Sequence, residues 1–209
     1  YKPERLTGIC QTFYNDLAIV VSPRSGYTDL KQVIEAARSH KHSFFYGVPG
    51  LGTVPHLAAL QLEQFAKLKL EAVSYKGDPG VLAALRSEEI ELGVIATGSA
   101  LTQGFQMLAV LAPQRVHEAP GVPTATELGY PVLSQVLGGI YGAKAIPLEV
   151  REQLQAACKA TVASSKYMSA AQRMSTNPSY GNANNFNQAI NLGSVRNHEI
   201  IRTSNLRIE

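Results

Sequence analysis

Short apolar runs alternate with amphipathic stretches through the first half of the chain. The run LAIVVSP, residues 17–23, is rich in β-branched residues and ends at a proline, which is typical of a buried strand. In TDLKQVIEAARSH, residues 28–40, apolar side chains recur at helical spacing, and Thr28 or Asp29 can cap the helix. Further strands are expected at residues 43–48, 70–75, 90–96 and 105–113, with helices at 54–68 and 79–89.

This alternation predicts an α/β fold. We expect a mainly parallel sheet between Leu17 and Val110, with helices on both faces. After Pro113 the pattern changes to a proline-rich connector that contains one short helix, TATELG. The last third is expected to hold a glycine-rich strand and return loop at 136–147, a helical region at 148–175 that breaks near Ser164 and Ser165, and an amphipathic helix at 184–203.

The composition is that of an ordinary globular protein, and it disfavours some partners. Of the 209 residues, 45% are hydrophobic and 17% are charged, and the net charge is +3. Lysine and arginine are scattered, so we expect no nucleic-acid partner, whereas a small anion suits the mild positive charge. No apolar run approaches the ~20 residues of a membrane span. The opening residues, YKPERLTGIC, do not have the pattern of a signal peptide.

Few residues stand in patterns that support catalysis. The sequence has no HExxH, GxSxG or paired-cysteine zinc motif, so we expect no enzyme activity, no cofactor and no metal. Cys10 and Cys158 lie too far apart for a Cys-x-x-Cys motif. They are either two buried thiols or, in an oxidising compartment, a disulfide, and composition alone does not choose between these.

The clearest candidate site is the loop that follows the strand at 43–48. Three glycines and two prolines lie between Gly47 and Pro55, directly before a helix. Ligands of open parallel sheets bind at the carboxyl ends of strands, and the amides and dipole of a helix N-terminus favour an anion. A tight turn in which Thr53 only caps the helix is the alternative. Pro55 stands where a GxGxxG motif needs its third glycine, so nucleotide binding is not expected.

Two further strand ends carry groups that can contact an anion. YKGDPG supplies backbone amides and Lys76, which can equally be a solvated turn residue, and Asp78 can cap the next helix. ATGSA supplies the hydroxyls of Thr97 and Ser99, which can instead cap a helix. His56 either contacts the ligand or packs between helix and loop. The candidate ligand-binding residues are Gly50, Leu51, Gly52, Thr53, Val54, His56, Tyr75, Lys76, Gly77, Thr97 and Ser99.

Five segments, in chain order, resemble a known family. They are YGVPGLGTVPHLA, VSYKGDPGVLAALRS, LGVIATGSAL, LAVLAPQRVHEAPGVPTATELGYPV and GIYGAKAIPLEVREQL. They are similar to the substrate-binding (Bug-type) receptors of tripartite tricarboxylate transporters, from Tyr1 to about Leu154 and more weakly beyond. The resemblance implies a periplasmic-binding-protein fold of two α/β lobes joined by crossing strands. It also implies a periplasmic location, capture of a small carboxylate in a cleft, and delivery to membrane permease subunits.

The resemblance also implies roles for individual residues. Gly52, Thr53 and the amides that follow are expected to hold the carboxylate, with Tyr75, Lys76 and Gly77 alongside. Where the family often has an Asp-Asn-Leu-Pro-Ser run, this chain has IATGS. The acidic residue of that run is therefore missing, which removes a contact to a ligand ammonium group or a bound water.

The chain begins where the family crosses into its second lobe. By resemblance, residues 16–136 form the second ligand-binding lobe, and residues 1–15 and 137–209 are crossing segments and C-terminal helices of an incomplete first lobe. We therefore expect an uncovered apolar face and self-association. The residues expected on that face are Ile146, Leu154, Phe186 and Ile190.

Two other functions remain as alternatives. The effector-binding domain of a cytoplasmic transcriptional regulator has a similar fold and length, although the YKG and GVPT segments do not look like that family. A small α/β transferase could use the Gly50–Thr53 loop to bind phosphate, and a nucleotide-binding assay distinguishes it from a receptor.

Overall fold

The chain divides into two compact units. The computed structural model describes residues 5–39, 44–204 and 206. Unit 1 consists of residues 1–15 and 136–199, and unit 2 of residues 16–135 and 200–209. The contacts thus group residues 200–204 with unit 2, whereas all of 137–209 was predicted to lie in one lobe. The assignment of the two units to lobes of a receptor stays a prediction.

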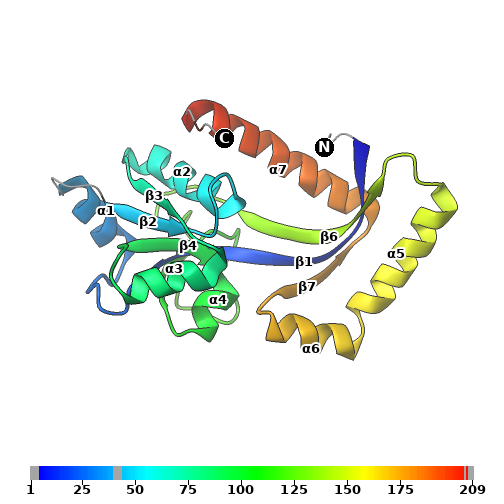
Figure 1. The fold of residues 1–209 in the computed structure, drawn as a ribbon, viewed down its shortest axis with the longest axis horizontal. Helices are drawn as coiled ribbons and strands as arrows, with labels where there is room; N and C mark the ends of the chain where they lie inside the picture. Colours follow the sequence, from blue (N-terminus) through cyan, green and yellow to red (C-terminus); the bar gives the residue numbers. More distant parts are fainter. Residues whose placement is uncertain (1–4, 40–43, 205, 207–209) are drawn as a thin grey trace. The chain divides into compact units, whose positions relative to one another are not determined.

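The sheet of unit 2 has the strand order β3–β2–β4–β1–β5. Strands β3, β2, β4 and β1 are labelled in Figure 1. Its strands are β1 (Leu6–Val21), β2 (Phe45–Val48), β3 (Glu71–Ser74), β4 (Leu92–Ala96) and β5 (Gln106–Val110). β2 pairs in parallel with β3 and β4, whereas β1 is antiparallel to β4 and β5. Four of these five strands therefore run in one direction, and the expected mainly parallel sheet is confirmed.

β1 departs from the prediction in both length and direction. The sequence indicated one strand at 17–23, but β1 begins at Leu6 and runs against its neighbours. Residues 17–21 are buried in the sheet of unit 2, while most positions from Gln11 to Asn15 are only half-buried. The earlier part of β1 lacks the continuous apolar run of a buried strand, so the pattern could not reveal it.

Helices follow the strands of unit 2, and all of them except the short helix after β4 were predicted. They are α1 (Leu30–Ser39), α2 (Val54–Ala66), α3 (Gly77–Arg86) and α4 (Thr97–Thr102). The Asp29 carboxylate accepts the Gln32 N–H at 2.9 Å, so Asp29 caps α1. A Cβ placed on Gly93 of β4 would lie only 2.7 Å from Val81 of α3, which shows how closely α3 packs on β4. This packing sets the position of the first turn of α3 relative to the sheet.

The segment TATELG forms a turn and not the expected short helix. The Thr124 N–H donates to Glu127 at 2.7 Å, and the Glu127 N–H donates to the Thr124 hydroxyl at 3.1 Å. These reciprocal bonds stabilise a single turn, and Pro131 follows closely, which prevents a helix from continuing. Thr124 also forms a parallel bridge with Val110.

Unit 1 is built around the first part of β1. β6 (Gln135–Ala143) and β7 (Asn177–Gly181) both pair with β1. The helices are α5 (Leu148–Val162), α6 (Ser165–Arg173) and α7 (Ala183–Ser204) up to residue 199. The predicted break is confirmed, because the Ser164 hydroxyl accepts the Tyr167 N–H at 3.2 Å and caps α6. β7 was not predicted, since NPSYG is polar and contains a proline. In the described residues, no helix is long and apolar enough to cross a membrane.

Phe186 of α7 lies in the core of unit 1, not on an open apolar face. It is fully buried, and its ring centroid is 5.1 Å from that of Tyr141. A Cβ on Gly8 would lie 2.7 Å from the Phe186 ring, and one on Gly139 would lie 2.6 Å from it. Glycines on β1 and β6 thus leave room for the ring. The expectation that Phe186 takes part in self-association was therefore wrong.

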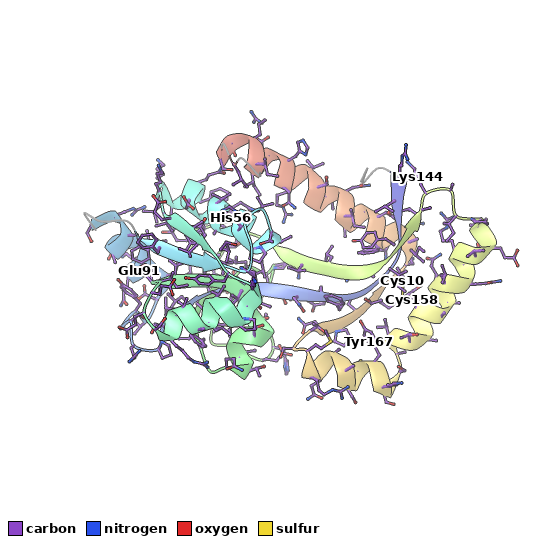
Figure 2. The ribbon with its side chains drawn as sticks, viewed as in Figure 1. Cys10, His56, Glu91, Lys144, Cys158 and Tyr167 are labelled. Carbon is purple, nitrogen blue, oxygen red and sulfur yellow. A yellow bond between two sulfur atoms is a disulfide. The ribbon has the colours of Figure 1, made fainter. Side chains whose placement is uncertain are left out.

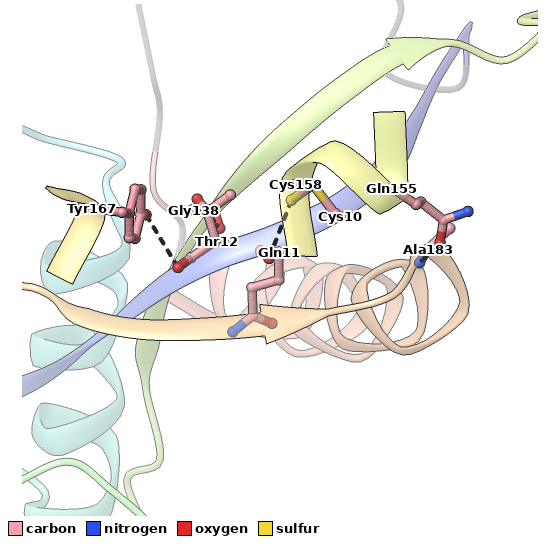
Figure 3. The surroundings of a disulfide bond; sticks show 8 residues. All are labelled: Cys10, Gln11, Thr12, Gly138, Gln155, Cys158, Tyr167 and Ala183. Carbon is pink, nitrogen blue, oxygen red and sulfur yellow. Dashed lines mark hydrogen bonds between the residues drawn. A yellow bond between two sulfur atoms is a disulfide. The ribbon is translucent and has the colours of Figure 1, made fainter. Parts of the chain in front are cut away.

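A disulfide joins Cys10 of β1 to Cys158 of α5 (Figure 3). Both cysteines are buried and neither is free, which decides between the two alternatives left by the sequence. Close by, the Tyr167 hydroxyl donates to the Thr12 carbonyl at 3.1 Å. Two helices of unit 1 are therefore fastened to β1, one by a covalent bond and one by a hydrogen bond.

Candidate functional site

Three loops meet at one edge of the sheet of unit 2. β3, β2 and β4 are neighbours and run in parallel, so their carboxyl ends share an edge. The Tyr75 N–H donates to the Val48 carbonyl at 2.9 Å, which ties the end of β3 to the end of β2. The loops and the first turns of the helices that follow these strands contain all of the candidate residues. The topology thus brings the three predicted segments together.

The Gly50–Thr53 loop is closed by its own hydrogen bonds. Gly52 has φ of 72°, a conformation that favours glycine, and its N–H donates to Nδ1 of His56 at 2.9 Å. The Thr53 hydroxyl donates to the Gly50 carbonyl at 2.6 Å. The Gly52 amide, expected to contact a carboxylate, is thus already paired with His56.

Thr53 stands at the N-cap of α2, but its side chain does not cap the helix. Its carbonyl accepts the Leu57 N–H at 3.0 Å, as an N-cap carbonyl should. Its hydroxyl is used within the loop, so no side chain at the N-cap accepts a bond from the first turn. Pro55 has no N–H to donate. The Thr53 side chain therefore does not cap the helix, whereas the alternative of a tight turn without an anion stays open, and the positive end of the helix dipole is left to other partners.

His56 lies in the first turn of α2 (Figure 2) and packs between helix and loop. Its side chain is 3% exposed, and its ring centroid lies 6.3 Å from that of Tyr46 on β2. Burial lowers the pKa of the imidazole, which favours its neutral form. Because Nδ1 accepts the Gly52 N–H, the proton of neutral His56 belongs on Nε2. Of the two roles considered for His56, the geometry supports packing.

The YKG turn contributes one exposed charge. The Tyr75 hydroxyl donates to Glu89 at 2.9 Å, and the half-buried Tyr75 ring packs against the core of unit 2. Burial, and after it Glu89, raises the pKa of Tyr75 to about 12. The Gly77 N–H donates to the Tyr75 carbonyl at 3.1 Å. Lys76 is exposed, and of these three residues it is the one that presents a charged group to solvent.

Asp78 connects the YKG turn with the ATGSA segment. Its Oδ2 accepts the Ser99 hydroxyl at 2.6 Å and the Ala96 N–H at 3.2 Å. Asp78 therefore does not cap its own helix, whose N-cap is Lys76. Local sequence patterns do not reveal this link, because the bonded residues are 18 and 21 positions apart. Thr97, at the start of α4, is buried and is not exposed to a ligand.

Asp78 also places an acidic group beside IATGS. The resemblance suggested that the acidic residue of this segment is missing, and the structure brings a carboxylate there from α3 instead. The position of Asp78 at the start of the predicted helix was the sequence signal that could have identified this carboxylate. In the described part of the chain, no group of three or more His, Cys, Asp or Glu residues could hold a metal ion.

A comparison with protein families matches residues 1–206 to the model described as the tripartite tricarboxylate transporter family receptor. Among curated relatives, a UPF0065 protein of Pseudomonas sp. strain P51 is 27% identical over 164 residues, which cover 75% of this chain and 48% of that protein. A UPF0065 protein of Cupriavidus necator is 24% identical over 174 residues, covering 81% and 53%. The chain thus spans about half the length of these curated relatives.

Solved structures agree with this match at the level of the fold. A Rhodopseudomonas palustris protein solved with adipate has a TM-score of 0.85 and 21% identity, covering 98% of this chain and 71% of that one. At such identities the likeness supports the fold alone, a periplasmic-binding-protein-like α/β arrangement.

Proposed function

Since the chain belongs to the tripartite tricarboxylate transporter receptor family, we propose that it captures a small carboxylate at the edge where β2, β3 and β4 end. The ligand sits against the Gly50–Thr53 loop and the first turn of α2. Val54 and His56 present backbone amides, and Lys76 presents a charge. Binding is non-covalent, and the receptor delivers the ligand to membrane permease subunits in the periplasm.

The start of α2 is the observation that carries this proposal. A helix N-terminus favours an anion by about 0.3–1 kcal/mol when exposed, and by up to ~2 kcal/mol when partly buried. Each hydrogen bond from an amide to a charged acceptor adds about 1.5–3 kcal/mol. Because the Thr53 hydroxyl is turned to Gly50, it does not compete with an anion for the amides of this turn.

The family supports the proposed partners and location. The match favours a receptor over the effector domain of a transcriptional regulator or a phosphate-binding transferase. A buried disulfide is consistent with an oxidising compartment such as the periplasm. The adipate of the R. palustris structure makes a dicarboxylate a sensible first probe for this chain.

Calorimetric titration tests the proposal with a panel of adipate, malate, citrate and glutamate. We expect weak binding, of ~millimolar Kd, because exposed anion contacts are screened by water and salt. Gly52→Val should abolish it, since a β-branched residue is strained at the φ of 72°. Gly26→Val is the matched control: Gly26 has φ of 74° and no atom within 4 Å of an added Cβ. The control shares the backbone strain but lies outside the site.

Two results would contradict the proposal. One is an unchanged affinity of Gly52→Val for the whole panel, which would mean that the glycine serves only the turn. The other is equal loss of binding in Gly26→Val, which would assign the effect to strain. Melting temperatures and light scattering accompany the titrations, so that unfolding and dimer formation are excluded.

The Lys76→Met variant measures how much the exposed charge of Lys76 contributes to the binding free energy. We expect less than a fivefold loss of affinity, because an exposed charge pair contributes about 0–1 kcal/mol. Lys31→Met, which removes an exposed lysine from α1, controls for the change in net charge.

A further inference from the structure

The bond between His56 and Gly52 has no role yet in the proposed site. Nδ1 of His56 accepts the Gly52 N–H at 2.9 Å, from a side chain that is 3% exposed. This bond spans four residues and joins the first turn of α2 to the loop that precedes it. A buried imidazole with one nitrogen paired to a backbone amide is held in a single orientation.

We propose that His56 is the positioning residue of the Gly50–Thr53 loop, and that its unprotonated Nδ1 keeps the loop in the form that admits a carboxylate. The inference rests on the proposed function for its ligand. With the Gly52 N–H bound to His56, the loop is tied to the first turn of α2, with Gly52 at φ of 72° and the Thr53 hydroxyl directed to Gly50. The start of α2 then stays open to the anion.

Protonation of His56 destroys this arrangement. An imidazolium carries N–H groups on both ring nitrogens and accepts no hydrogen bond, so Nδ1–H would face the Gly52 N–H. The neighbouring titratable groups do not compensate. The ring faces Tyr46, whose own pKa is raised by burial and then by Glu63, so that Tyr46 stays neutral. The lowered pKa of His56, caused by burial, keeps the acceptor form present at neutral pH.

The affinity for carboxylate should therefore fall as the pH falls below the pKa of His56. If only the neutral form is competent, the apparent Kd rises in inverse proportion to the neutral fraction, up to about tenfold per pH unit below the pKa. The opposite behaviour, tighter binding at low pH, would mean that the imidazolium contacts the anion directly. The two roles thus predict pH profiles of opposite sign.

His56→Asn is the informative variant, with His56→Leu beside it. An asparagine Oδ1 can replace Nδ1 as acceptor for Gly52, and it does not titrate in this range. We expect His56→Asn to bind within about threefold of the parent at neutral pH and to lose the parent's pH dependence. His56→Leu has no acceptor and should bind at least tenfold more weakly. Protonation of the ligand affects all variants equally and cancels in the comparison.

A measurement without ligand separates this inference from the proposed function. In nitrogen-15 NMR of the ligand-free chain, Nε2 of His56 should carry the proton at neutral pH, and the Gly52 amide signal should move with the His56 titration. A proton on Nδ1, or a Gly52 signal that ignores the titration, overturns the inference. If the coupling is present but no variant binds any carboxylate, the proposed function fails and the positioning of the loop by His56 stands. Equal pH profiles for the parent and His56→Asn overturn the link between loop and affinity.

Discussion

Removing the disulfide should cost unit 1 much of its stability. The bridge joins Cys10 and Cys158, 148 positions apart in sequence. For a closed loop of that length, the chain-entropy relation gives about 5 kcal/mol at 25 °C, and most measured values lie at about 2–4 kcal/mol. Replacement of both cysteines by serine also buries two hydroxyls, since both positions are almost inaccessible to solvent. We therefore expect a loss of at least about 2 kcal/mol.

Urea denaturation followed by circular dichroism measures this loss. The chain has no tryptophan and nine tyrosines, so tyrosine fluorescence is a second probe. Because the two units need not unfold together, hydrogen exchange with mass spectrometry should localise the effect. Faster exchange is expected in residues 6–14 of β1 and in α5 (Leu148–Val162), with little change in α3 (Gly77–Arg86).

Two controls make the result decisive. The alanine pair, Cys10→Ala with Cys158→Ala, avoids buried hydroxyls, and reduction of the parent by dithiothreitol breaks the bridge without any substitution. If all three lose less than about 1 kcal/mol, the bridge does not constrain the unfolded chain as reasoned. A loss confined to α3 and its neighbours would equally refute the assignment to unit 1.

Three further predictions test other parts of the structure. Phe186→Ala should lower the free energy of unfolding, measured in urea, by about 3–5 kcal/mol. Leu192 lies on the same helix but is 62% exposed, so Leu192→Ala should lower it by less than about 0.5 kcal/mol. Asp78→Ala removes the acceptor of Ser99 and should cost about 1–3 kcal/mol, with Asp78→Asn costing less. Burial lowers the pKa of His56 in the folded protein, so the contribution of His56 to the free energy of unfolding is complete above about pH 6.5 and is lost as the pH falls towards the folded pKa. The melting temperature of His56→Asn should therefore depend less on pH than that of the parent.

Local sequence patterns were enough to predict most strands and helices of unit 2 and the position of its candidate site. Apolar runs bounded by turn residues identified β2 to β5, and the glycines and prolines between Gly47 and Pro55 identified the loop before α2. Such signals are local, because a strand, a turn and a helix start each depend on residues close together in the chain. For the same reason the break at Ser164 was predicted correctly.

The features that join distant residues became known from the tertiary structure alone. The early part of β1 and all of β7 carry weak local patterns, and they form strands because they pair with each other across more than 160 positions. The disulfide needed the same pairing, since the cysteines could be matched only once β1 and α5 were placed. Phe186 looked like an exposed apolar residue in the sequence, yet glycines on β1 and β6 make room for it in the core.

At the candidate site, the sequence likewise predicted the positions of residues but not their hydrogen-bond partners. The sequence placed Gly52, Thr53 and Ser99 correctly at one edge of the sheet, because parallel strands end together. It could not tell which polar groups would pair with one another there. The Gly52 amide bonds to His56, the Thr53 hydroxyl to the loop, and Ser99 to Asp78 on another helix. Hydrogen bonds are short and directional, so these pairings depend on ångström-scale positions that the packing of α2 and α3 on the sheet sets and that no periodicity encodes.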